Sequence, residues 1–140
     1  PILIGLVGSE MCIRDRIKLY FDEMEDLGPD QQTYMENKYD RIQEHLEEID
    51  RILNEKSTGW KTKRMSKVDL NILRLAVFEM KYDEDVPVKV AINEAVEISK
   101  VFGGEDSASF INGILGKVAR EALEQHLFCR TGKYLYKKYV

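Results

Sequence analysis

The spacing of apolar residues along the chain predicts helices separated by short polar or glycine-containing breaks. The most regular pattern runs through residues 35–53, where apolar side chains recur at alternating four- and three-residue steps. This spacing puts them on one stripe of a helix, with charged residues on the remaining surface. We therefore predict one helix here, packed in a bundle rather than paired in a coiled coil. The stripe consists of Met35, Tyr39, Ile42, Leu46, Ile49 and Leu53.

Further helical patterns flank this segment. On its N-terminal side, residues 17–26 predict a short helix that ends at Gly28, with Pro29 in a usual position to open the next helix. On its C-terminal side Gly59 interrupts the pattern, and Ser66 is a typical N-cap residue. The helix that follows Ser66 has apolar residues on a broad face, so we expect it to be central and largely buried.

Two more helices are predicted after this one. Pro87 suits the first turn of a helix with a broad apolar or small face, and a pair of glycines ends it. The last core helix begins near Asp106 or Ser107 and contains Gly113 and Gly116. Because glycine inside a helix costs stability, we predict that these two positions allow a neighbouring helix to approach closely. No strand pattern occurs, so the predicted class is all-α, a bundle of about five to six helices.

The composition restricts the functional class. Hydrophobic residues make up 44% of the 140 residues and charged residues 33%, which is the balance of a folded soluble domain. The net charge of −4 argues against a general nucleic-acid binder but leaves room for a local basic patch. Two cysteines far apart favour a reducing compartment, and no apolar run approaches the roughly 18 residues that span a membrane. We therefore expect a cytoplasmic protein without a membrane segment.

The chain contains no recognisable catalytic or metal-binding pattern. His45 stands among Glu44, Glu47 and Glu48, but these residues interleave with the apolar stripe and are typical of a solvated helix face. No glycine-rich phosphate loop and no set of nucleophile, histidine and carboxylate is found. The residues therefore predict a binding module that has no catalytic residue, no metal and no cofactor.

Two places combine exposure with groups that can contact nucleic acid. One is the basic loop of Lys61, Lys63 and Arg64, for which the alternative is a loop that only aids solubility. The other is the turn that contains Phe102 and Asp106. There a helix N-terminus offers N–H groups, the ring offers a stacking face, and the carboxylate can accept from base amino groups. The alternatives at this turn are a buried Phe102 and an Asp106 that only caps its helix.

Three stretches in the C-terminal half carry a resemblance to a known family. Together, "LRLAVFEM", "DVPVKVAINEAVEISKVFG" and "FINGILGK" closely resemble the C-terminal part of the NusB family of bacterial transcription antitermination factors. The similarity extends more weakly towards the N-terminus and covers about residues 17–122, which is most of the chain.

The resemblance implies a fold, partners and site residues. Members of the family are all-α proteins of two small helical subdomains. They pair with NusE, a ribosomal protein of the small subunit, and the pair binds the boxA element of nascent RNA. The complex joins RNA polymerase to promote antitermination and ribosomal RNA synthesis. Carried over position by position, the resemblance implies that Phe102, Asp106 and Phe110 face RNA and that Asp69 contacts NusE.

The N-terminal end departs from the family. Its members begin with an arginine-rich segment and a first helix, whereas "GLVGSEMCIRDR" resembles a string found at the ends of unrelated chains translated from sequencing adapters. We therefore expect residues 1–16 to be a non-native leader and the N-terminal subdomain to be incomplete. The predicted division is this leader, a NusB-like helical domain over residues 17–125, and a basic aromatic tail over residues 126–140.

The tail and the function each have an alternative interpretation. Basic and aromatic residues interleave in the tail, a pattern that can bind RNA but is also compatible with a frayed terminal extension. The predicted function is an antitermination adaptor that binds boxA RNA together with NusE. The alternatives are the RNA-binding domain of a ribosomal RNA cytosine methyltransferase and a helical protein-interaction bundle that does not contact RNA.

Overall fold

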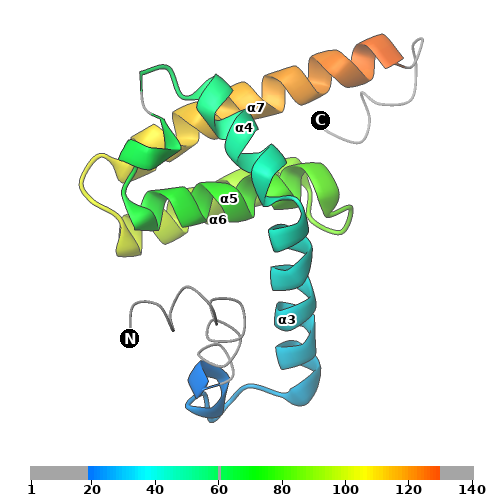
Figure 1. The fold of residues 1–140 in the computed structure, drawn as a ribbon, viewed down its shortest axis with the longest axis vertical. Coiled ribbons are helices and arrows are strands. Elements are labelled where there is room, and N and C mark those ends of the chain that lie inside the picture. Colours follow the sequence, from blue (N-terminus) through cyan, green and yellow to red (C-terminus); the bar gives the residue numbers. More distant parts are fainter. Residues whose placement is uncertain (1–18, 60, 130–140) are drawn as a thin grey trace, which may run out of the picture. The chain divides into compact units, whose positions relative to one another are not determined.

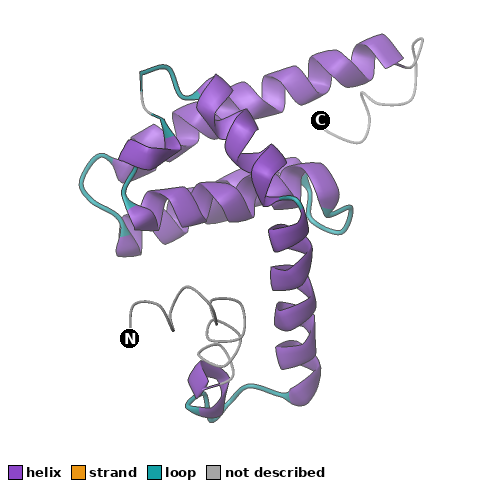
Figure 2. Cartoon of the chain, viewed as in Figure 1, coloured by secondary structure: helices purple, strands orange, loops and turns teal. Residues whose placement is uncertain are grey.

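The computed structural model describes residues 19–59 and 61–129, with side chains as far as Ala122. The regular structure in these ranges is helical, without a strand, which confirms the all-α class (Figure 1, Figure 2). The predicted leader and residues 130–140 of the predicted tail lie outside the described residues. The elements are α3 (Pro29–Glu44), α4 (Leu46–Lys56), the 3-10 helix η1 (Thr62–Arg64), α5 (Lys67–Tyr82), α6 (Val88–Phe102) and α7 (Ser107–Cys129).

The chain divides into two compact units, Pro1–Arg41 and Ile42–Val140. In the first unit, the helical turn at residues 19–22 is followed by turns and not by further helix. The prediction of a helix over residues 17–26 is therefore wrong in its extent. Leu19 in this turn is 64% exposed, and a helix this short is not stable without a packed apolar face.

The single helix predicted over residues 35–53 is also wrong, because the chain breaks at His45 into α3 and α4. His45 has φ −107° and ψ 6°, and its N–H donates to the carbonyl of Ile42 at 3.1 Å. This three-residue step replaces the four-residue step of an α-helix. α4 buries Ile49 and Leu53 fully, whereas α3 buries none of its residues. The break therefore separates the half of the stripe that supplies fully buried residues from the half in which Ile42 is partly buried against the core.

The centre of the second unit is α5, which contacts α4, α6 and α7. Leu73, Val77 and Phe78 in its middle are fully buried, and the first two lie on the predicted apolar face. Burial of apolar side chains of this size contributes roughly 1.5–3 kcal/mol each. Ser66 caps the helix as predicted, since its Oγ accepts a hydrogen bond from the backbone N–H of Asp69 at 3.1 Å. The position of the first turn of α5 is thus fixed both by its cap and by the packing behind it.

α6 and α7 complete the core. The buried positions of α6 are Ala91, Ala95 and Ser99, and such small side chains let this helix lie close to its neighbours. α7 contributes Ile111 and Leu115, which are both fully buried. The face of apolar or small residues predicted for α6 and the core position predicted for α7 are therefore confirmed.

Ion pairs connect α4 to the helices on which it packs. Arg74 of α5 donates two hydrogen bonds to Asp50 of α4, from Nε to Oδ1 at 2.8 Å and from Nη2 to Oδ2 at 2.7 Å. The two side chains are only 25% and 27% exposed. Lys56 at the end of α4 forms a second ion pair, with Glu121 of α7. The bidentate geometry of the first pair orients α4 across α5 more strictly than apolar contact alone.

The role predicted for Gly113 and Gly116 is wrong. Among the described residues, a Cβ added at either position would meet no atom within 4 Å beyond its own helix backbone and chain neighbours, so neither glycine makes room for a neighbouring helix. A close approach occurs instead at Gly103. There a Cβ would lie 2.6 Å from the Ser99 carbonyl oxygen and 2.6 Å from the Ser107 Cβ. The packing therefore requires the glycine that ends α6 and not those within α7.

Replacing the exposed Gly113 by alanine should raise the free energy of unfolding by about 0.8–1 kcal/mol, the difference in helix propensity between the two residues. Space for the added methyl group is available, so no packing loss opposes this gain. The urea midpoint of unfolding, compared with that of the unmodified chain, measures the change.

Gly103→Ala is the matched substitution at the crowded position. It should lower the free energy of unfolding by about 1–3 kcal/mol, because the methyl group must displace the Ser99 carbonyl or the Ser107 side chain. If both alanine substitutions shifted the urea midpoint in the same direction, this assignment of packing would be wrong.

Candidate functional site

An open hollow of about 490 Å³ lies where α5 and α7 begin. Its wall comes from three segments that are distant in the sequence: the end of η1, the first turn of α5, and the turn between α6 and α7 with the start of α7. They meet because α6 returns alongside α5 and so brings the start of α7 to the start of α5. The lining residues are Arg64, Met65, Ser66, Asp69, Gly104, Glu105, Asp106, Ser107 and Phe110.

Capping hydrogen bonds hold the two helix starts beside the hollow. At α5 the cap is Ser66, described above. At α7 the backbone N–H of Gly104 donates to Oγ of the buried Ser107 at 2.8 Å, which closes the turn. Within the described residues, no donor is bound to the carboxylate of Asp106. Asp106 holds the N-cap position, because its carbonyl accepts from the Phe110 N–H at 3.0 Å, but its carboxylate makes no capping bond there.

Asp69 has the most unusual environment in the hollow. Its Oδ1 is shielded from solvent and has no hydrogen-bond partner in the described part of the chain. A shielded polar atom without a partner costs about 1–3 kcal/mol and is rare in folded proteins. The bond of Asp69 to the Ser66 cap comes from its backbone N–H and does not involve the carboxylate. The carboxylate of Asp69 therefore has the capacity to accept a hydrogen bond from outside the described residues.

The electrostatics of the hollow favour donors over anions. Among the described residues that line it, Arg64 is the only cation, against the carboxylates of Asp69, Glu105 and Asp106. Arg64, Glu105 and Asp106 are exposed and lie at the rim, whereas Asp69 is partly buried. A ligand in the hollow would meet acceptors inside and a cation at the opening.

The two phenylalanines predicted to face RNA lie in different environments. Phe110 is half-buried, packs against the core and lines the hollow. Phe102 is the last residue of α6, is 70% exposed and does not line the hollow. The alternative of a buried Phe102 is therefore wrong. Its ring remains available as a stacking surface near the turn.

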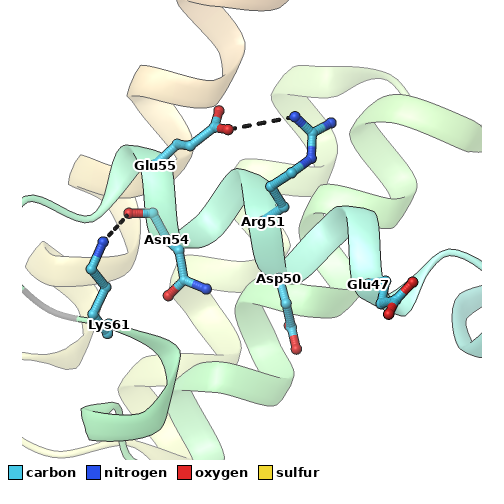
Figure 3. Close-up of a pocket in the computed structure, with 6 residues that line it drawn as sticks. All are labelled: Glu47, Asp50, Arg51, Asn54, Glu55 and Lys61. Carbon is cyan, nitrogen blue, oxygen red and sulfur yellow. Dashed lines mark hydrogen bonds and ion pairs between the residues drawn. The ribbon is translucent and has the colours of Figure 1, made fainter.

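The basic loop is divided between two environments. Arg64 lines the hollow, while Lys61 lines a second, shallow hollow of about 400 Å³ on the surface of α4 (Figure 3). There the Lys61 Nζ donates to the Asn54 carbonyl at 3.5 Å, and the Thr62 N–H donates to the Asn54 Oδ1 at 2.8 Å. These bonds attach the loop to α4. Lys63 is exposed and lines neither hollow.

The ionisable groups with the largest pKa changes lie away from the hollow. A hydrogen bond from Lys81 to Glu48 at 2.6 Å is the main reason that the pKa of Glu48 is lowered from 4.5 to about 2. Tyr82 also donates to Glu48, at 2.5 Å. Burial, followed by this bond to a carboxylate, raises the pKa of Tyr82 from 10.0 to about 12. These groups tie α4 to the end of α5, so they stabilise the fold instead of marking the candidate site.

Sequence patterns alone do not point to several residues of the hollow. Met65 is a buried wall residue in a loop, and loop residues give no periodic signal. The sequence identifies Ser66 as a cap but not as part of a site. Gly104 and Ser107 follow the end of α6, and the Ser at the start of a helix is the one available signal there.

The fold and the hollow together define the class: a small helical binding module with an acceptor-rich recess between two helix starts. None of the helices in the described ranges is long and apolar enough to cross a membrane. The sequence matches the NusB family over residues 6–120, and the chain belongs to this family. The family match begins within residues 1–16, whose assignment to a leader stays a prediction.

Curated relatives carry the name transcription antitermination protein NusB. The protein from Lachnoclostridium phytofermentans is 56% identical over 106 residues, which cover 76% of this chain and 80% of that protein. The protein from Agathobacter rectalis is 47% identical over 107 residues, with 76% and 82% covered. These values support a relationship along most of both chains.

Solved structures share the fold. NusB of T. maritima aligns with a TM-score of 0.66 at 37% identity, covering 69% of this chain and 68% of that one. A chain in the crystal structure of a plectonemic RNA supercoil aligns with a TM-score of 0.69 at 26% identity, covering 76% and 77%.

The cluster around Glu48 predicts how stability depends on pH. The folded pKa of Glu48 lies below its ordinary value, so its contribution is present above about pH 4.5 and is lost as the pH falls towards 2. The folded pKa of Tyr82 lies above its ordinary value, so its contribution is present below about pH 10 and is lost as the pH rises through 12. Thermal melts of the unmodified chain and of Tyr82→Phe between pH 8 and 12 provide the test.

We expect the melting temperature of the unmodified chain to fall by about 2–5 °C more than that of Tyr82→Phe above pH 10, because only the unmodified chain has a phenol at position 82 to ionise. Glu48→Gln is the corresponding variant for the acid side. Parallel alkaline curves for the unmodified chain and Tyr82→Phe would show that the bond between Tyr82 and Glu48 does not stabilise the fold.

Proposed function

We propose that this chain is a transcription antitermination adaptor that binds RNA and pairs with a protein of the transcription complex. The specific partners are the boxA element of nascent ribosomal RNA and the ribosomal protein NusE, within the antitermination complex of RNA polymerase. In this role the chain is a binding protein and not an enzyme, and it acts in the cytoplasm.

The observation that carries the proposal is family membership with high identity. Relatives that are 47–56% identical over about three quarters of this chain bear the name transcription antitermination protein. One of the solved structures with a similar chain is that of an RNA supercoil, which agrees with an RNA partner.

The hollow supports the RNA part of the proposal with suitable chemistry. Arg64 at the rim can bind a phosphate, Phe110 in the wall can stack on a base, and Asp106 can accept from a base amino group. Exposed groups outside the hollow extend the proposed RNA surface. They are Lys61, Lys63 and Phe102.

The proposal of NusE as the protein partner comes from the family resemblance. The resemblance implies that Asp69 contacts NusE, and this contact stays a prediction. Asp69 lies in the wall shared with the proposed RNA contacts, so a protein bound there would lie next to the RNA. Such proximity would make the two partners bind cooperatively, since each adds contacts to the other.

Filter binding of radiolabelled boxA RNA tests the proposed function. The full chain is titrated into the RNA with and without a fixed excess of NusE, and a scrambled RNA of the same composition serves as control. We expect NusE to lower the apparent Kd for boxA by at least about fivefold, the low end of typical coupling between sites. An apparent Kd for boxA that is the same with and without NusE would contradict the adaptor function.

The salt dependence of the same titration separates RNA binding from a purely protein-binding role. With two or three cations in contact with phosphate, log K should fall against log salt with a slope of about −1.4 to −2.1, as for single strands. A protein-interaction bundle without RNA contact would give no saturable binding at low salt.

Asp106→Asn tests the proposed RNA contact at the rim. A carboxylate about 7 Å from a phosphate in water repels it by about 0.6 kcal/mol, whereas the amide oxygen of Asn can still accept from a base amino group. The substitution should therefore strengthen RNA binding roughly threefold at low salt. The melting temperature should stay unchanged, because the carboxylate has no bonded donor among the described residues.

The matched control is Asp85→Asn, which removes the same charge from an exposed position in the turn after α5, at the opposite end of that helix. It should leave RNA affinity unchanged. An equal gain in both variants would indicate a general charge effect and no contact at Asp106.

A further inference from the structure

The segment that joins α4 to α5 concentrates positive charge in an acidic chain. Residues 57–68 contain four cations and no carboxylate, whereas the whole chain has a net charge of −4. The three cations of the basic loop, Lys61, Lys63 and Arg64, are exposed. Within the ranges that the structure describes, none of the three forms an ion pair, whereas both cations of α4 are paired with carboxylates. The loop therefore keeps its charge available to an external anion.

The short helix of this loop, η1, is held from outside by Asn54 of α4. The Asn54 Oδ1 accepts from the Thr62 N–H at 2.8 Å, and the Asn54 carbonyl accepts from the Lys61 Nζ at 3.5 Å (Figure 3). Thr62 is the first residue of η1, so its N–H has no partner inside that helix, and Asn54 supplies one. At the other end of η1, the buried Met65 joins the core. The turn that carries the cations is thus fixed at both ends.

The beginning of the same segment is held by α7. The Lys117 Nζ donates to the Thr58 Oγ1 at 2.8 Å and to the Lys56 carbonyl at 3.3 Å. Lys56 is the last residue of α4, and the end of a helix carries partial negative charge. The ammonium of Lys117 therefore lies at a favourable position, where it ties the end of α4 and the start of the loop to α7.

These bonds fix the loop without using the side chains of Lys63 and Arg64. Given the proposed function, in which these two cations contact phosphate, we propose that Asn54 and Lys117 are positioning residues for RNA binding. They hold Lys63 and Arg64 in place before the RNA backbone arrives. A loop that is fixed in advance loses less conformational entropy on binding, so it binds more tightly than the same charges on an unanchored loop.

A positioning role differs from a purely structural one in a measurable way. A positioning residue acts through the loop cations, so its removal weakens RNA binding only while those cations are present. A residue that only stabilises the fold, or that contacts RNA itself, has the same effect with or without them. Its substitution is therefore coupled to removal of the cations in the first case and additive in the second.

Filter binding of single-stranded boxA RNA to the full chain, with NusE present and at low salt, measures this coupling. The cycle consists of the unmodified chain, Asn54→Ala, Lys63→Gln/Arg64→Gln, and the variant that combines all three substitutions. We expect Asn54→Ala alone to weaken binding about two- to tenfold, the range that the net value of one hydrogen bond gives. In the variant without the two cations, the same substitution should change affinity less than about 1.5-fold.

Asn54→Ala is a suitable change because alanine has a higher helix propensity than asparagine, so α4 itself is not weakened. The matched control is Asn37→Ala, which makes the same substitution at an exposed position of α3 and should leave RNA affinity unchanged.

Thr58→Val tests the second anchor and does not depend on the folding of Asn54→Ala. It removes the hydroxyl that Lys117 binds but keeps the ammonium of Lys117. We expect RNA binding to weaken about twofold or more, because the start of the loop is released. Unchanged or tighter binding would show that Lys117 does not act through the loop, and would overturn its positioning role.

The cycle also separates this role from the proposed function. An equal loss from Asn54→Ala in both backgrounds, or no loss in either, would overturn the positioning role of Asn54. Tight binding of boxA by Lys63→Gln/Arg64→Gln would show that the loop does not contact RNA, which overturns both anchors and leaves the proposed function intact. An unmodified chain that does not bind boxA would refute the proposed function, and the positioning role with it.

Discussion

Burial of α5 on several sides is the constraint on which the rest of the second unit depends. Its middle residues are fully buried against α4, α6 and α7, so the helix cannot slide along its axis without opening the core. Its first turn, with Ser66 and Asp69, is therefore held opposite the start of α7. A recess formed by the ends of fixed helices is ordered before any ligand binds. This order lowers the entropic cost of binding.

The charges around the hollow can be compared with the two tasks that the proposed RNA binding requires. Contacts to phosphate position the nucleic acid, and contacts to base edges specify its sequence. In the proposed function, Arg64 and Lys63 are exposed and suit the first task, and Asp106 at the rim suits the second. The net charge of −4 does not conflict with the proposed function, because a few cations near the opening would act locally.

The fold was largely predictable where helices pack in the core. Periodicity identified α5, α6 and α7 and their buried faces, because a buried stripe leaves a repeat of three and four residues in the sequence. The same repeat failed at His45, since one three-residue hydrogen-bond step breaks a helix without disturbing the spacing of apolar residues. The prediction for Gly113 and Gly116 failed for a different reason. A glycine in the sequence gives no sign of whether its position is in a close helix contact or on an open surface.

The sequence by itself determined the helical class, the core faces, the Ser66 cap and the family resemblance, because each depends on residues close together in the chain or on motif identity. It also supplied the candidates for the site, but as separate groups. Only the tertiary structure decided that Arg64, Asp69, Asp106 and Phe110 share one hollow while Phe102 lies outside it. The physical reason is that spacing along a helix fixes which way a side chain points, whereas the packing of helices against one another fixes which helix ends meet.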